Sequence, residues 1–216
     1  MAIAPFIASG QWPGNWGAPG PFSNKRRAAS SMSQDAAAGT DAITYREAEE
    51  GDRAALVALG RASFDAAFGH LYSSDDLNSF LHSVHSPEAV AAQIADRDVA
   101  YRLAFKGEKL VGYCKLAANK GFGEAALINS QAKRPITLSQ LYTDPAQTGR
   151  GIGAALMDWA LAEAKSRRAD AIQLSVWSEN HDAQRFYARH GFTRIADIDF
   201  WVGKHRDDEF LYERML

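Results

Sequence analysis

The sequence predicts an α/β fold, a mixed and mostly antiparallel sheet with helices on both faces. Two observations predict this fold: the alternation of strand and helix patterns along the chain, and the length and composition of the chain. From residue 42 onward, segments with apolar residues at strand spacing alternate with segments at helical spacing, and glycine- or proline-containing turns separate them. The chain has 216 residues, of which 46% are hydrophobic and 23% are charged. This length and composition fit one domain and leave hardly any room for a second.

The composition also excludes several classes of protein. A net charge of −2 gives no general attraction to nucleic acids or to anionic lipid surfaces. The apolar runs are only a few residues long, far below the ~20 that a membrane-spanning helix needs. The single cysteine, Cys114, excludes an internal disulfide and a thiolate zinc site. We therefore expect a cytoplasmic protein with no metal and with no nucleic-acid or membrane partner.

The first forty residues differ in composition from the rest. They hold five of the 17 glycines and four of the seven prolines, and they show no helical or strand periodicity. Such a segment buries too little apolar surface to offset its ordering entropy, so we expect a disordered tail, residues 1–40, ahead of a single domain, residues 41–216. Lys25 to Arg27 with nearby serines leave a transit peptide as an alternative. Met32 is an alternative start, which would place residues 1–31 outside the native protein.

The first half of the domain is expected to begin with a strand at residues 43–46. Three helices follow, because apolar residues recur every three or four positions in each. Ser86-Pro87-Glu88 is a typical helix start, with a hydroxyl side chain before the helix and proline in its first turn. The three expected helices are Leu56 to Phe68, Leu77 to Val84 after the acidic pair Asp75-Asp76, and residues 87–95. A hairpin ends this half, with strands 100–105 and 110–117 joined by the turn 106–109.

The second half alternates strands and helices. It follows a glycine-containing stretch, residues 118–135, that has no periodicity and is expected to be irregular. Two strand–helix pairs come next, and two further strands close the chain. The expected strands are residues 136–142, 171–176, 192–196 and 210–215, and the expected helices are residues 152–166 and 181–190.

The most informative segment joins a predicted strand to a predicted helix. It contains three alternate glycines, Gly149, Gly151 and Gly153, which let the backbone approach a ligand and direct successive N–H groups at it. The helix N-terminus adds unpaired donors and the positive end of the helix dipole. Together these features are typical of an anion site suited to phosphate or pyrophosphate, and Arg150 adds a positive charge.

Several ligand classes compete for this loop. A nucleotide-triphosphate loop ends in Gly-Lys-Ser/Thr, whereas this one ends in Gly-Ile-Gly-Ala. The dinucleotide fingerprint matches the spacing of Gly149, Gly151 and Ala154, but residues 144–148 separate the loop from its strand and few elements remain to complete such a domain. Coenzyme A pyrophosphate is the third class. A glycine-rich turn without any ligand is the remaining alternative.

A second constellation lies on the helix that follows. Asn180 stands at the N-cap position, and Gly191 stands just beyond the helix C-terminus. Ala183 and Tyr187 share one helix face and align with Asn180. A small residue between two polar-tipped ones suits a helix that lies against a bound ligand. The alternative is structural, with Asn180 as a cap only and Tyr187 as a core aromatic residue whose hydroxyl is hydrogen-bonded.

Together these two segments resemble the GNAT acetyltransferase superfamily. The run from Gly149 to Ala154 resembles its acetyl-CoA pyrophosphate loop, and the later motif is matched by Asn180, Ala183, Phe186-Tyr187 and Gly191-Phe192. The resemblance implies the GNAT-like acyl-CoA N-acyltransferase fold. It also implies an enzyme that moves an acetyl group from its co-substrate acetyl-CoA to an amine. Thr148 stands where the family often has Gln or Arg. Main-chain N–H groups supply most of the hydrogen bonds to the pyrophosphate, so we expect the loop to bind acetyl-CoA without that side chain.

The resemblance further implies roles for individual residues. The strand 136–142 would diverge from the strand 171–176, and the pantetheine arm would lie in the gap. A neutral amine would attack the thioester directly in a ternary complex, and Tyr187 would protonate the departing CoA thiolate. Asn180 would bond the cofactor or its water, and one N–H of residues 141–143 would polarise the thioester. The cofactor-binding residues are expected to be Leu141, Tyr142, Thr143, Thr148, Gly149, Arg150, Gly151, Ile152, Gly153 and Asn180.

The general base is not evident from the sequence. The strand where this superfamily often has a carboxylate reads Thr137-Leu138-Ser139-Gln140. Either water carries the proton away or a residue of the first two helices helps. Cys114 alternates with apolar neighbours and is expected in the core, not as an acetyl carrier. The helix candidates, all interpreted as solvated surface, are Asp65, Asp75, Asp76, His82 and His85.

The acceptor is expected to be a small-molecule amine or a polyamine. Residues 200–216 and 176–180 are similar to bacterial spermidine/spermine N-acetyltransferases of the superfamily. Two alternatives from other classes stay open, a non-catalytic acyl-CoA-binding sensor and a nicotinamide-dinucleotide-binding oxidoreductase. The sequence also leaves a homodimer open.

Overall fold

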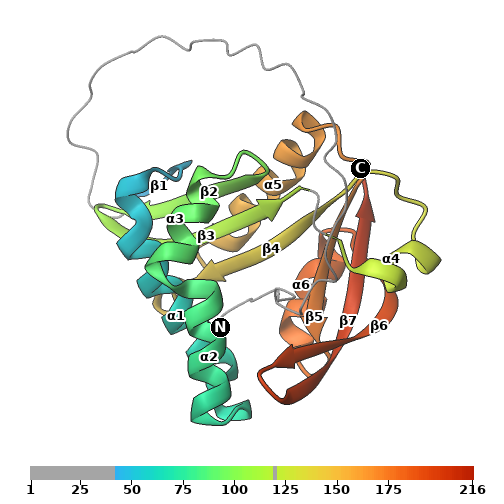
Figure 1. The fold of residues 1–216 in the computed structure, drawn as a ribbon. Helices are drawn as coiled ribbons and strands as arrows, with labels where there is room; N and C mark the ends of the chain where they lie inside the picture. The colour runs from blue at the N-terminus through green and yellow to red at the C-terminus, as the bar shows by residue number, and fades with distance from the viewer. Residues whose placement is uncertain (1–41, 119–120) are drawn as a thin grey trace.

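The computed structural model describes residues 42–118 and 121–216, which form one seven-stranded sheet (Figure 1). The strand order is β1-β2-β3-β4-β5-β7-β6. Every neighbouring pair is antiparallel except β4 and β5, so the predicted mixed sheet is confirmed. The expected tail, residues 1–40, lies outside the described residues. The strands are β1 Ile43–Glu47, β2 Val99–Lys106, β3 Lys109–Ala117, β4 Pro135–Thr143, β5 Ala171–Trp177, β6 Thr193–Val202 and β7 His205–Met215.

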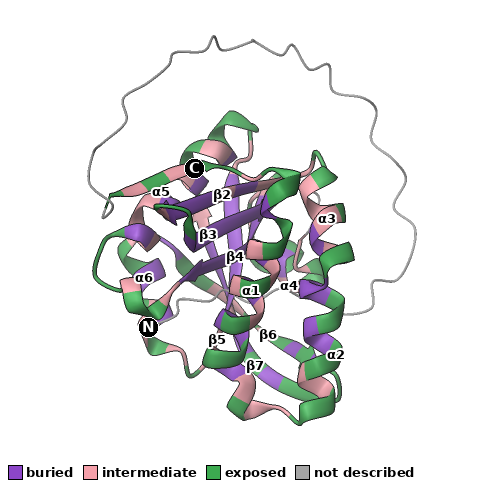
Figure 2. Cartoon of the chain, turned by 90° about the vertical axis from the view of Figure 1, so that its left-hand side faces the viewer, coloured by how far each residue is buried: buried purple, intermediate pink, exposed green. Residues whose placement is uncertain are grey.

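Helices cover both faces of the sheet and enclose two cores. The first three helices pack on one face around Phe64, Leu103 and Tyr113. The last two pack on the other face around Leu156 and Leu174. Figure 2 shows the resulting band of buried residues along the central strands. The helices are α1 Arg53–Phe68, α2 Ser74–His85, α3 Pro87–Ala95, α4 Gly123–Asn129, α5 Ile152–Ser166 and α6 His181–Arg189, with 3₁₀ turns η1 Glu50–Asp52, η2 Gly69–Leu71 and η3 Pro145–Gln147.

The predicted helix starts are confirmed where a side chain caps them. The Ser86 hydroxyl accepts the N–H of Ala89 at 3.1 Å, and Pro87 opens α3. Ser73 caps α2 in the same way, through the N–H of Asp76. Each cap satisfies a donor that the helix itself leaves unpaired.

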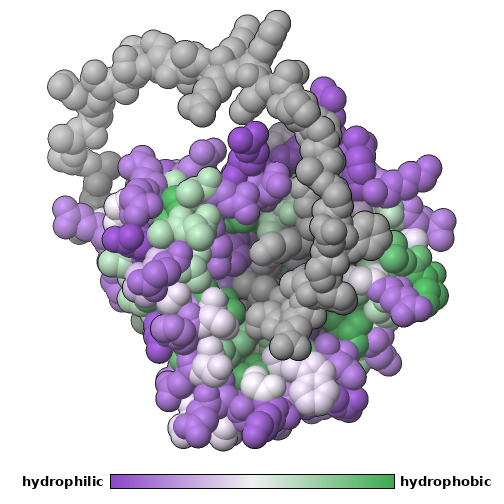
Figure 3. Space-filling view, in the orientation of Figure 1, coloured by the Kyte–Doolittle hydropathy of each residue, from purple (hydrophilic) through white to green (hydrophobic). Residues whose placement is uncertain are grey.

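Two expectations about irregular or short segments were wrong. The stretch 118–135 contains the short helix α4, which periodicity missed because its two large apolar side chains do not face a core. Leu127 is 81% exposed and Ile128 is 70% exposed, and Figure 3 shows hydrophobic surface at the edge where α4 lies. The closing hairpin is longer than residues 192–196 and 210–215, because the turn comes at Gly203, which has a φ of +58°. Charged residues on its exposed face hid the strand pattern.

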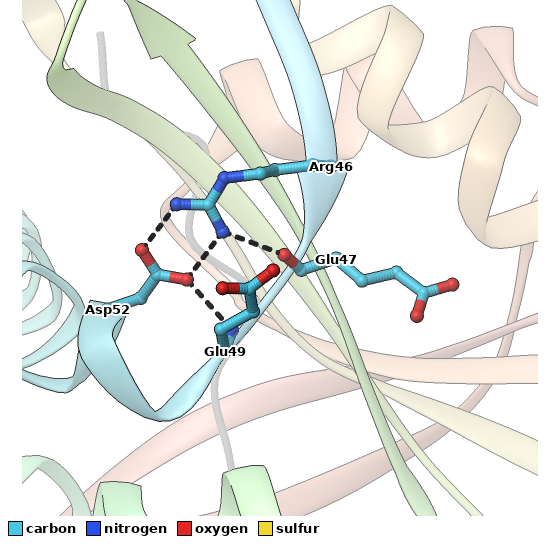
Figure 4. Close-up of polar contacts among 4 residues, drawn as sticks. All are labelled: Arg46, Glu47, Glu49 and Asp52. Carbon is cyan, nitrogen blue, oxygen red and sulfur yellow. Dashed lines mark hydrogen bonds and ion pairs between the residues drawn. The ribbon is translucent and has the colours of Figure 1, made fainter. Parts of the chain in front are cut away.

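An ion pair anchors the start of α1 to the edge strand (Figure 4). Both terminal nitrogens of the Arg46 guanidinium, Nη1 and Nη2, donate to the carboxylate of Asp52, each at 2.6 Å. The same carboxylate accepts the N–H of Glu49 at 2.8 Å. Hydrogen bonding to Arg46 holds the pKa of Asp52 below its ordinary value. This contact fixes the N-terminal end of α1, whose other end reaches the site described next.

Candidate active site

The sheet opens into a fork between β4 and β5 (Figure 1). These parallel strands pair only at their first residues, from Pro135 opposite Ala171 to Thr137 opposite Gln173. Beyond that point β4 continues to pair with β3, and β5 continues to pair with β7. The predicted divergence of the two strands is therefore confirmed, and the fork widens toward their C-terminal ends.

The backbone of β4 directs alternate groups into this fork. The Asp144 N–H donates to the carbonyl of Val111 on β3 at 2.8 Å. Because main-chain groups alternate along an antiparallel ladder, those of Tyr142 also face β3. Those of Leu141 and Thr143 consequently face away from β3, on the side of the fork. Of the three residues expected to bind through their main chain, two are thus turned in the required direction.

A β-bulge at Ser139 changes which side chains of β4 face each core. The register with β3 skips this residue, since Lys115 pairs with Gln140 and the next pair on β3 involves Leu138. Leu138 lies in the core beneath α5. Gln140 turns to the opposite face, where its side-chain oxygen accepts the Tyr113 hydroxyl at 3.3 Å. The neutral amide of Gln140 therefore occupies a position on β4 where a catalytic carboxylate could have stood.

The glycine loop presents main-chain donors at the start of α5. Gly149 and Gly151 have φ values of +82° and +76°, which only glycine adopts without strain. Gly151 is the N-cap and has no side chain to satisfy the helix donors. The first intrahelical bond runs from Ala155 N–H to the Gly151 carbonyl at 3.0 Å, so the N–H groups of residues 152–154 have no acceptor within the helix. This exposed end suits a phosphate group.

Local contacts hold the shape of that loop. The Asp144 carboxylate pairs with Lys109 at 2.7 Å and accepts the N–H of Ala146 at 2.9 Å. The Thr148 hydroxyl donates to the carbonyl of Pro145 at 2.8 Å. The side chain of Thr148 therefore supports the turn, and the donors available at the helix start are main-chain groups.

Helix α6 begins and ends as its sequence predicts. The Asn180 side-chain oxygen accepts the N–H of Ala183 at 3.0 Å, which confirms it as the N-cap. Gly191 has a φ of +78° directly after the helix. A Cβ built at Gly153 of α5 would lie 3.7 Å from the Phe186 ring, so α6 runs close beside the glycine loop. The two motifs that are separate in sequence are adjacent in space.

Tyr187 is the most unusual residue of α6. Its side chain is fully buried, and within the described residues its hydroxyl has no hydrogen-bond partner. Burial raises its pKa well above the ordinary value, and nearby Cys114 and Tyr142 add to the rise. The hydroxyl is therefore protonated and able to donate. The structural alternative of a hydrogen-bonded core tyrosine is therefore wrong for the described residues, and an unsatisfied buried hydroxyl costs ~1–3 kcal/mol.

The opposite face of the sheet carries polar groups that sequence reasoning missed. The Tyr72 hydroxyl, between η2 and α2, donates to the Asp207 carboxylate at 2.5 Å. Glu209 lies two residues farther along β7 and is 1% exposed. The available signal was acidic residues at alternate positions next to an apolar strand. It was overlooked because the strand was expected to begin only at residue 210.

The candidate bases on the first helices do not form a site. His85 was interpreted as surface, but it is buried, and burial lowers its pKa to about 3. Asp76 accepts the N–H of Lys204 at 3.0 Å and so ties α2 to the β6–β7 turn. Cys114 is buried in the core, as expected. The remaining candidates are exposed, as expected, and are Asp65, Asp75 and His82.

In residues 42–118 and 121–216, no three His, Cys, Asp or Glu side chains are grouped so that they could hold a metal ion. Over the same part of the chain, no helix is both long enough and apolar enough to cross a bilayer.

Comparison with known proteins identifies the family. The family described as the acetyltransferase (GNAT) family matches residues 66–192. An uncharacterised N-acetyltransferase of Lactobacillus delbrueckii subsp. lactis is 27% identical over 171 residues, covering 79% of this chain and 95% of the relative. The aminoalkylphosphonate N-acetyltransferase of Salmonella typhimurium is 31% identical over 105 residues, covering 49% of this chain and 64% of that enzyme.

Solved structures share the fold. The PaiA N-acetyltransferase of Thermoplasma acidophilum, solved in complex with coenzyme A, superposes with a TM-score of 0.64 at 22% identity. The match covers 81% of this chain and 99% of that one. An N-acetyltransferase of Staphylococcus aureus Mu50 has a TM-score of 0.61 over 81% of this chain and 99% of its own, at 13% identity. These relatives and neighbours do not support the oxidoreductase alternative.

Proposed function

The chain belongs to the acetyltransferase (GNAT) family and is an N-acetyltransferase, and from that premise we propose that it transfers the acetyl group of acetyl-CoA directly to a primary amine. The observation that carries this proposal is the combination of an open fork between β4 and β5 with a glycine-started helix on one side and an unsatisfied tyrosine hydroxyl beneath it. An extended arm, a diphosphate and a thiolate leaving group match these three features in turn.

The glycine loop would hold the diphosphate. The main-chain N–H groups of residues 152–154 open α5, and the positive end of its dipole favours an anion. Built Cβ atoms at Gly149 and Gly151 meet nothing within 4 Å, so these glycines are required by backbone conformation and not by crowding within the protein. Arg150 is exposed in the same loop and adds a charge-assisted contact. Asn180 would bond the co-substrate beside this loop or a water associated with it.

The fork would hold the reacting part of the co-substrate. The pantetheine arm is an extended chain with amide groups, and the main-chain groups of Leu141 and Thr143 face the space it would enter. One of these N–H groups would polarise the thioester oxygen as negative charge develops there. Tyr187 would donate its proton to the departing thiolate, which supplies the hydroxyl with the partner that the protein does not provide.

The acceptor is proposed to be a small amine or polyamine. The closing hairpin and the block 176–180 are similar to bacterial spermidine/spermine N-acetyltransferases. The Salmonella relative is named for aminoalkylphosphonates, which are also small primary amines. We therefore propose a small molecule that carries a primary ammonium group, not a protein, as the acceptor.

Thiol release tests the proposal. The purified protein is incubated with acetyl-CoA and, in turn, with polyamines, aminoalkylphosphonates, amino sugars, amino acids and peptide N-termini. We expect acetyl-CoA to bind and at least one small amine to release free thiol in stoichiometric proportion to acetylated product. Tight acetyl-CoA binding with no thiol release from any amine would instead support the binding-only sensor.

A further inference from the structure

The buried carboxylate of Glu209 stands at the open end of the fork. Glu209 pairs with Trp177, the last residue of β5, in the antiparallel ladder between β5 and β7. Because β4 and β5 pair only at their beginnings, the end of β5 is where the fork is widest. Glu209 therefore lies one strand away from the space assigned to the thioester.

This carboxylate is buried, with the Ser175 hydroxyl close enough to lower its pKa. Within the described residues, neither of its oxygens makes a hydrogen bond of ordinary geometry, and the side chain is 1% exposed. Glu213, on the same strand and the same face, shows the contrast. It is also buried, but its carboxylate accepts hydrogen bonds from Gln173, at 2.8 Å, and from Ser130. A buried carboxylate that the protein leaves unsatisfied is costly unless a ligand supplies the donor.

The surroundings of Glu209 combine negative charge with aromatic rings. Asp207 is on the same face of β7, where it accepts the Tyr72 hydroxyl and pairs with His205 at 3.2 Å. The ring of Trp177 makes an edge contact with Phe68, with centroids 6.0 Å apart. Carboxylates and aromatic faces are the groups that recognise ammonium ions when water is excluded. The chemistry of this cluster fits a protonated amine.

Electrostatic contacts connect this cluster to the leaving-group side of the fork. Burial is the main cause of the raised pKa of both Tyr72 and Tyr187, and Tyr142 on β4 adds to each rise from between the two faces, so it lies near both hydroxyls. Asp207 and Glu209 both raise the pKa of Tyr72 as well. The end of β4 therefore separates two groups of polar side chains, with the carboxylates on the α1 face and Tyr187 on the α5 face.

We propose that Asp207 and Glu209 form the acceptor-amine subsite and that Glu209 removes the proton from the bound ammonium. This inference rests on the proposed acetyl transfer and names the recognition site and the base that the β4 sequence lacks. Asp207 is already held by Tyr72 and His205, so it supplies fixed negative charge. Glu209, whose oxygens make no hydrogen bond of ordinary geometry in the described residues, would accept the proton of the substrate.

The reaction then balances as follows. The ammonium gives one proton to Glu209, and the nitrogen lone pair forms a bond to the thioester carbon. The carbon–sulfur bond breaks, and the sulfur leaves with its electron pair and receives a proton from Tyr187. The second proton of the nitrogen returns to the tyrosine oxygen, directly or through water. Glu209 releases its proton to solvent, so acetyl-CoA and an ammonium become an amide, free thiol and one proton.

The charged state of Glu209 fits this role. Burial raises its pKa to about 8, the nearby Ser175 hydroxyl lowers it, and Asp207 raises it. The titratable groups around the cluster are Tyr72, Tyr142, Asp207 and His205, together with His70, whose ring contacts Trp177 with centroids 6.4 Å apart. A bound ammonium favours the ionised carboxylate, so proton transfer takes place inside the complex.

The decisive experiment compares Glu209→Gln with Asp208→Asn, the matched control on the exposed side of the same strand. Both variants and the wild type are assayed with the best amine of the panel above and with hydroxylamine, which is neutral at pH 7. For the strongly basic amine, we expect Glu209→Gln to lower kcat/KM by ~100-fold or more. We also expect the variant to lose the decrease in kcat/KM that the wild type shows as pH falls below about 8. Hydroxylamine turnover and acetyl-CoA affinity are expected to stay within a few-fold, and Asp208→Asn to match the wild type.

Three results would overturn the assignment. One is a Glu209→Gln enzyme with wild-type kcat/KM and pH profile. Another is an equal loss with both amines, which indicates a structural role. If the variant fails to fold, the pH profile of the wild type is the third test. A wild-type kcat/KM for the basic amine that does not decrease at acid pH contradicts a carboxylate base. Failure of the proposed function would appear separately, as a wild-type protein that acetylates no amine at all.

Discussion

Replacing Tyr187 with phenylalanine tests stability and catalysis at once. The substitution removes one oxygen from a fully buried side chain and keeps the ring, which contacts Phe186 and Phe192 at centroid distances of 5.3 and 5.7 Å. That oxygen has no partner within the described residues. Leaving a buried hydroxyl unsatisfied costs ~1–3 kcal/mol. The ligand-free Tyr187→Phe protein is therefore expected to be more stable than the wild type.

The expected size of the effect is measurable. For a domain of this length, ~1 kcal/mol of added stability raises Tm by ~2–4 °C. The same change removes the proposed proton donor, so kcat is expected to fall by ~10²–10⁴ while acetyl-CoA still binds. Thermal melts without ligand, calorimetric titration with acetyl-CoA and the thiol-release assay measure the three quantities. A protein that gains stability and loses turnover is the signature of a group kept for chemistry and not for packing.

Tyr101→Phe is the matched control. Tyr101 is also a buried tyrosine, but its hydroxyl donates to the Gln93 side chain at 2.6 Å. Removing it deletes this hydrogen bond, while the Gln93 oxygen keeps the Lys115 Nζ donor at 3.0 Å, so stability is expected to fall by about 1 kcal/mol with turnover unchanged. The reasoning about Tyr187 would be refuted if Tyr187→Phe destabilised the protein as much as the control does. It would equally be refuted if that variant acetylated amines at the wild-type rate.

Three further predictions follow from single contacts. Gly151→Ala places a side chain at a φ of +76°, so stability should fall by ~1–2 kcal/mol and the KM for acetyl-CoA should rise. An unchanged Tm together with an unchanged KM would contradict the role assigned to the loop. Asn180→Ala removes the acceptor for Ala183 N–H, and urea unfolding should show a loss of about 1 kcal/mol, whereas no loss would mean that the cap is not formed. Folding raises the pKa of Glu209 from 4.5 to about 8; the folded state then holds a proton that the unfolded chain has lost, and its stability falls as pH rises across that interval. Glu209→Gln should therefore lose less Tm between pH 6 and pH 9 than the wild type, and identical pH dependence would exclude the raised pKa.

Local signals were sufficient to predict most of the elements. Helix α3 begins at Pro87 because Ser86 caps it, and α5 spans the predicted residues 152–166 because glycine precedes a regular apolar stripe. Helix α4 was missed because its large apolar side chains, Leu127 and Ile128, are exposed, and periodicity reports only what packs against a core. The length of the β6–β7 hairpin was underestimated for the related reason that its outer face is charged.

The site was predictable only in part. The glycine loop and α6 were recognised because backbone conformation and capping are encoded by neighbouring residues. Their adjacency was inferred from the resemblance and is visible in the structure through Gly153 and Phe186. His85 was placed on the surface because a polar residue near a helix end is ordinarily solvated, whereas here the sheet buries it.

The sequence by itself determined the order of the elements, the caps and the phosphate-type loop, because these depend on contacts between residues a few positions apart. Only the tertiary structure decided where the sheet divides and which polar groups are left without partners. Whether the Tyr187 hydroxyl or the Glu209 carboxylate is satisfied depends on atoms contributed by distant strands and helices. No local pattern carries that information, and it is these two unsatisfied groups, on opposite faces of the sheet, that identify the proposed acid and the proposed base.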